Sequence, residues 1–136
     1  MGSWGFGAFE NDDAFDWYSF FQDDPTLSRI ERAFHQVLTA AILDIDIIQA
    51  SEAFAASEIM LALVTQSCRR IPFAEETLES ISALRVDKEL LTSGIEALDR
   101  LRHPECGARN VFGDDTSYAT WQSKINETLS LLNVLK

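Results

Sequence analysis

The residues best placed to do chemistry are four acids near the N-terminus: Glu10, Asp12, Asp13 and Asp16. On a helix, positions 12 and 16 share a face, and positions 13 and 16 are also neighbours. Carboxylates at this spacing can hold Mg²⁺ or Ca²⁺ through oxygen, favour a helix N-terminus, or present an acidic patch. The glycine and glutamate offsets of an EF-hand are missing, so we expect no metal here. We favour capping by Asn11 or Asp12.

Glu58 is the second candidate, because its neighbours three and four positions away are all apolar. They are Phe54, Ala55, Leu61 and Ala62. A carboxylate in such surroundings needs hydrogen-bond donors, since burying an unpaired charge is costly. We hypothesise that Glu58 accepts hydrogen bonds from the glycine-rich loop at residues 2–7, or from the indole N–H of Trp4 or Trp17. A general acid or base and an exposed glutamate are the alternatives.

No catalytic signature accompanies these acids. The chain contains no G-x-S-x-G, H-E-x-x-H, P-loop or dinucleotide-binding pattern. His103 and Cys106 are spaced to supply two metal ligands, but a zinc site needs three or four. We therefore predict no catalytic residue, no cofactor and no bound metal.

The first 24 residues combine aromatic and acidic side chains. They hold eight of the fourteen aromatic residues and six of the 22 acids, and the first base is Arg29. Such large apolar groups are not typical of a disordered tail, so this segment must pack on the body or on a partner. We predict that an ordered Gly/Trp-rich loop is held by Trp4, Asn11, Asp12, Trp17 and Glu58. The predicted partner-binding residues are Glu10, Asp13, Asp16, Asp23 and Asp24.

The charge balance narrows the range of partners. The chain of 136 residues carries a net charge of −11, and its basic clusters are only Arg69–Arg70 and Arg100–Arg102–His103. Binding to nucleic acid or to an anionic membrane needs a cationic face. We therefore expect neither, and expect a protein partner with a cationic surface.

Length and cysteine content predict a single domain over residues 1–136. A chain of this length can bury a core without disulfides, and Cys68 and Cys106 are too few for a disulfide framework. The N-terminus lacks the basic residues and apolar stretch of a signal peptide, and no uninterrupted apolar run reaches membrane-spanning length. The expected compartment is the cytoplasm.

Helical periodicity runs through most of the chain. It predicts helices over residues 12–22, 25–42, 47–66, 74–84 and 87–102, and a last helix that begins at Asp114 or Asp115. Residues 68–72 are expected to be a linker and 104–113 a loop. Segment 47–66 is broadly apolar and should be central. The expected fold is all-α, a compact bundle of about six helices.

The N-terminal sequence MGSWGFGAFENDDAFDW also resembles a known family. It matches throughout the signature M-G-x-W-G-x-G-x-F-[ED]-N-D-x-A-x-D-W of DUF4259, small and mainly bacterial proteins of unknown function. The resemblance extends to the alanine-rich stretch AFAASEIMLAL and to Tyr118 and Trp121 of the last predicted helix. It implies an all-α fold and no particular activity.

Three functions of different classes fit these observations. The first is a protein-binding domain, in its most specific form an immunity protein that neutralises a cognate bacterial toxin by occluding a cationic active site. The second is an enzyme that uses Glu58 with Asp12 or Asp16, with or without a metal. The third is a regulatory or scaffolding domain, which includes a homodimer formed through leftover apolar surface.

Overall fold

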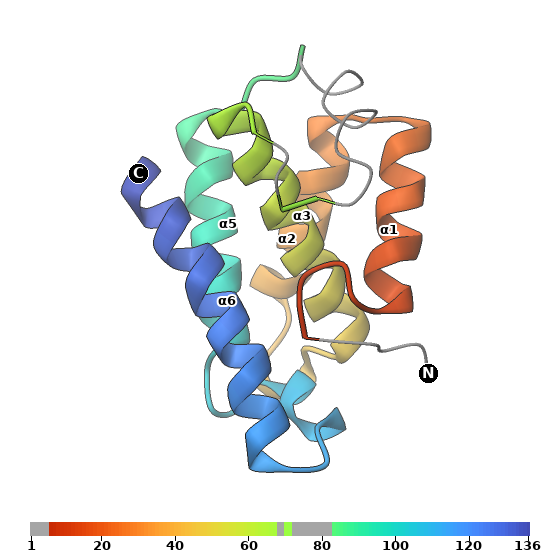
Figure 1. Cartoon of the computed structure of the whole chain (residues 1–136), viewed down its shortest axis with the longest axis vertical. Helices are drawn as coiled ribbons and strands as arrows, with labels where there is room; N and C mark the ends of the chain where they lie inside the picture. The colour runs from red at the N-terminus through yellow and green to blue at the C-terminus, as the bar shows by residue number, and fades with distance from the viewer. Residues whose placement is uncertain (1–5, 68–69, 72–82) are drawn as a thin grey trace.

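The computed structural model describes residues 6–67, 70–71 and 83–136, and within them it contains five α-helices, two short 3-10 helices and no strand. The elements, shown in Figure 1, are α1 (Asp12–Asp23), α2 (Leu27–Thr39), η1 (Ile42–Asp44), α3 (Ile47–Thr65), α5 (Lys88–Leu101), η2 (Gly107–Val111) and α6 (Asp115–Leu135). The all-α prediction is confirmed. The helix predicted near 74–84 and most of the predicted linker lie outside the described residues.

Each of these α-helices begins at a side chain that caps its first turn. Asn11 Oδ1 accepts a hydrogen bond from Ala14 N at 2.9 Å, so of the two predicted caps for α1 Asn11 is the one used. Asp46 and Gln49 form a reciprocal capping box on α3. The other caps are Thr26, Asp87 and Asp114. Local sequence therefore determines where the helices start.

α3 is the central helix, as its composition predicted. It contacts α1, α2, α5 and α6, and Figure 1 shows it between α1 on one side and α5 and α6 on the other. By length and composition α3 could span a membrane, but 72% of its apolar window is buried inside the protein. A largely apolar helix that other helices enclose is typical of the core of a helical bundle.

The predicted end of α2 was wrong. α2 ends at Thr39 and not near residue 42, because Arg100 of α5 donates to the carbonyl of Val37 at 3.0 Å and to that of Ala40. These bonds satisfy carbonyls that the helix end leaves free.

The segment 104–113, predicted as a loop, contains the 3-10 helix η2. Gly107 lets this turn approach η1 closely, since a Cβ at this position would lie 2.7 Å from the carbonyl oxygen of Ile45. The contact holds the segment before α6 against the body, and with it Phe112, which packs on the core.

Candidate functional site

The outward face of α1 carries acids that the sequence singled out. The helix packs on α3 through its buried side chains, which are Ala14, Trp17, Tyr18 and Phe21. On the opposite face runs a row of exposed side chains that we call the α1 stripe: Asp12, Asp16, Phe20 and Asp23. Phe20 is 64% exposed. Within the described part of the chain, none of the three acids forms a salt bridge.

The other predicted partner-binding acids have neighbours in their own chain. Glu10 accepts a hydrogen bond from the backbone N–H of Gly7 at 3.1 Å and so closes the turn before α1. Asp24 lies 3.5 Å from Arg29 in an exposed ion pair of little energetic value. Asp13 is half-buried beside Glu52, whose pKa is raised first by burial and further by the charge of Asp13.

The N-terminal leader is described only from Phe6 onward. Ala8 and Phe9 are buried, the Phe9 ring lies 5.1 Å from that of Tyr18, and the Phe6 ring lies 6.5 Å from that of Phe112. Trp4 lies outside the described residues, so the ordered Gly/Trp-rich loop stays a prediction for residues 2–5. The predicted anchor Trp17 is buried and stacks on Phe21.

Glu58 is buried, with 3% of its surface exposed, and it accepts hydrogen bonds from two side chains, those of Arg70 and Thr128. Arg70 donates to both carboxylate oxygens, from Nε at 3.0 Å to Oε2 and from Nη2 at 3.1 Å to Oε1. The Thr128 hydroxyl of α6 donates to Oε1 at 2.6 Å. Arg70 Nη1 also donates to Glu127 at 2.8 Å and holds the pKa of that carboxyl below its usual range.

The described donors to Glu58 therefore differ from the hypothesised ones. The carboxylate shares a cleft of about 440 Å³ with residues Gly7–Glu10. However, Arg70 and Thr128 supply the hydrogen bonds, and no bond from Trp17 or from the described part of the loop reaches Glu58. One signal was available: Thr128 is a polar residue on the otherwise apolar face of the last helix.

The carboxylates invoked for an enzyme are not brought together. Glu58 is held by Arg70 and Thr128, whereas Asp12 lines a different cleft. Among the described residues there is no group of three or more potential metal ligands, and His103 instead accepts a hydrogen bond from the backbone N–H of Glu105. Burial raises the pKa of Cys106, which keeps this thiol protonated.

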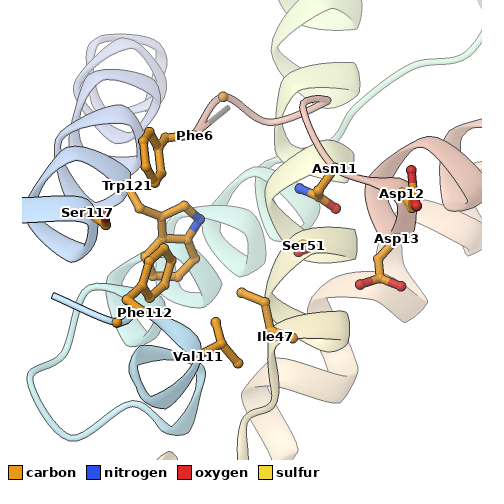
Figure 2. A pocket seen from close by; sticks show the side chains of 12 residues that line it. Phe6, Asn11, Asp12, Asp13, Ile47, Ser51, Val111, Phe112, Ser117 and Trp121 are labelled. Atoms are coloured by element: carbon orange, nitrogen blue, oxygen red, sulfur yellow. The ribbon is translucent and has the colours of Figure 1, made fainter. Parts of the chain in front are cut away.

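A second cleft, of about 210 Å³, lies at the start of α1 and is shown in Figure 2. We call it the N-terminal cleft. Phe6, Phe112 and Trp121 form one side of it, and Asn11, Asp12 and Asp13 form the other. Ile47 and Ser51 of α3 lie between the two sides. The rings pack on one another, and the ring centroids of Phe112 and Trp121 are 5.2 Å apart. The cleft thus has two walls. The aromatic wall is formed by Phe6, Phe112 and Trp121, and the carboxylate wall is formed by Asp12 and Asp13 beside Asn11.

Comparison with known proteins identifies a family but no activity. The model of a family described as "Domain of unknown function (DUF4259)" matches residues 2–124 of the 136. No curated protein and no solved structure matches the chain significantly. The matched range includes the α1 stripe, Glu58 and the whole N-terminal cleft.

Proposed function

The chain belongs to the DUF4259 family, a domain of unknown function, and from this premise we propose that it is a protein-binding domain for a cationic partner. One observation carries the proposal: Phe20 is 64% exposed and has acids four positions before it and three and four positions after it. These acids are Asp16, Asp23 and Asp24. An exposed aromatic ring among carboxylates suits a partner that offers an apolar pocket within a basic surface.

The negative charge of the α1 stripe favours a basic partner protein over a second copy of this chain. Asp12, Asp16 and Asp23 have no salt bridge within the described residues, so their field extends into solvent and would accelerate encounter with a basic surface. Two copies meeting stripe to stripe would place like charges together, which disfavours a homodimer through this face.

The most specific form of the proposal is a cytoplasmic immunity protein. The net charge of −11 and the unpaired acids of α1 suit the occlusion of a toxin whose active site is cationic. In this mechanism Phe20 is the central anchor, and the carboxylates displace the substrate from the basic cleft of the toxin.

The experiment is co-expression with the products of neighbouring genes, followed by affinity measurement on any product whose toxicity is relieved. We expect the triple variant Asp16→Lys, Phe20→Ala, Asp23→Lys to bind about a hundredfold more weakly and to lose protection. The matched control reverses the exposed acids Glu89 and Glu96 on α5 and should bind within about threefold of the original chain.

Two results would count against the proposal. In one, no neighbouring product is toxic or binds the chain. In the other, the α5 control loses as much affinity as the triple variant, which would mean that only net charge matters.

A further inference from the structure

Two buried polar groups point to a ligand in the N-terminal cleft. Trp121 is 5% exposed and Ser51 is 3% exposed, yet the indole N–H and the Ser51 hydroxyl make no hydrogen bond within the described residues. No side-chain nitrogen or oxygen there is both sealed from solvent and unpartnered. Both groups therefore open into the cleft, and Figure 2 shows the indole nitrogen directed toward the space between the walls.

The opposite wall holds negative charge that the described chain does not neutralise. Asp12 and Asp13 line the cleft, and no described lysine or arginine forms a salt bridge with either. Burial raises the pKa of Glu52, and the nearby carboxylates Asp13 and Asp46 raise it further. The start of α1 and the start of α3 thus concentrate negative charge beside an aromatic wall.

We propose that the N-terminal cleft receives an arginine side chain of the partner protein. This inference rests on the proposed function, because it is the proposed partner protein that would supply the arginine. The guanidinium pairs with the carboxylates of Asp12 and Asp13 and lies against the aromatic wall, as a flat and weakly hydrated cation can. The backbone carbonyl oxygen of the same arginine accepts a hydrogen bond from the indole N–H of Trp121. A cation without such an oxygen could not accept this bond.

The dimensions and the neighbourhood of the cleft favour this occupant. A volume of about 210 Å³ lies below the roughly 300–1,000 Å³ that is typical of pockets for drug-sized ligands, so one long side chain is the better fit. The chain makes a related contact with its own arginine nearby, since the Arg109 guanidinium lies 4.8 Å above the ring of Tyr118. Tyr118 in turn packs on Phe112, which lines the cleft.

The test titrates N-acetyl-arginine amide into the ¹⁵N-labelled full chain and follows the indole N–H signals by NMR. The Trp121 signal is assigned from Trp121→Phe. We expect it to shift saturably, whereas the neutral isostere N-acetyl-citrulline amide should leave it nearly unchanged. Asp13→Asn should weaken binding of the arginine probe about five- to tenfold, since it removes one charge from the pair. Asp16→Asn, on the same helix but outside the cleft, should stay within about twofold.

Three results would overturn the proposal. They are an equal response to the citrulline probe, an equal loss in Asp13→Asn and Asp16→Asn, and no saturable shift. A shift of the Trp121 signal in Trp4→Ala without any response to arginine would assign the cleft to the leader of this chain.

The two proposals fail separately. If the variant of the α1 stripe loses its partner while the arginine probe does not bind, only the cleft proposal falls. If the probe binds but the stripe variant keeps its partner, the cleft proposal stands and the α1 stripe is not the binding surface.

Discussion

Glu58 and the acids of the α1 stripe are the same chemical group in opposite surroundings. Glu58 is 3% exposed and accepts three hydrogen bonds at 3.1 Å or less from Arg70 and Thr128. Asp12, Asp16 and Asp23 are exposed and have no salt bridge within the described residues. A carboxylate that its own chain satisfies holds the fold together, whereas one that is left unpaired remains available to a partner.

Because of this difference, substitutions around Glu58 and substitutions in the α1 stripe should have different effects. Removing a donor from Glu58 leaves a nearly buried charge without its hydrogen bonds, so the cost appears in stability. Removing an acid from α1 leaves no buried group unsatisfied, so stability is nearly unchanged and the cost appears in binding. Four predictions test this contrast.

The largest effect on stability is expected from Arg70→Ala. It leaves the buried carboxylate of Glu58 with only the Thr128 hydroxyl. We expect a loss of about 2–3 kcal/mol, less than for a sealed pair because the Arg70 side chain is 37% exposed. The measurement is urea unfolding. The paired variant Glu58→Met, Arg70→Met should lose less than Arg70→Ala, and a loss below about 0.5 kcal/mol in Arg70→Ala would contradict a structural role for Glu58.

Thr128→Val should come next. The change keeps the shape of the side chain but removes the donor that lies 2.6 Å from Glu58 Oε1. We expect a loss of about 1.5–2 kcal/mol, as for a buried hydrogen bond to a charged group. Thr128→Ser is the control: it retains the hydroxyl and should lose only about 1 kcal/mol for the missing methyl group. A Ser variant less stable than the Val variant would show that packing, and not the hydrogen bond, matters at this position.

The stripe variant Asp16→Asn, Asp23→Asn should change stability by no more than about 0.5 kcal/mol, and in the stabilising direction, because it reduces repulsion in a chain of net charge −11. Thermal unfolding at low and high salt measures this. Salt should raise the melting temperature of the original chain more than that of the variant. A clear destabilisation would mean that these acids have structural partners of their own.

The smallest effect is expected at Glu52, whose burial is intermediate between that of Glu58 and that of the exposed acids of the α1 stripe. It is half-buried and accepts one hydrogen bond from Gln36 Nε2 at 2.8 Å, and burial raises its pKa. Between the usual glutamate pKa of about 4.3 and this raised value, the folded state binds more protons than the unfolded state. The contribution of Glu52 to stability must therefore fall as pH rises through that window.

Glu52→Gln removes this titration while keeping a side-chain oxygen for Gln36. Unfolding free energies of both proteins from pH 4 to 7 should show the original chain losing stability relative to the variant as pH rises. A difference that moves in the opposite direction would contradict the raised pKa.

Local patterns were enough to predict most of the helices. The caps Asn11, Asp87 and Asp114 and the apolar spacing that follows each are short-range features, which act within one turn. The end of α2 could not be predicted in this way, because Arg100 acts on its carbonyls from 60 or more positions away. Nor could η2, whose position depends on the approach of Gly107 to the backbone of η1.

The sequence by itself determined the helical class, the family, the central place of α3 and the excess of acid at the N-terminus. It also marked Glu58 as a carboxylate in need of donors. Only the tertiary structure decided that Arg70 and Thr128 are those donors, and that Trp121 lines the same cleft as Asp12 and Asp13. The physical reason is range: caps and periodicity act over three or four residues, whereas the hydrogen bonds of a buried charge and the walls of a cleft join segments that only packing brings together.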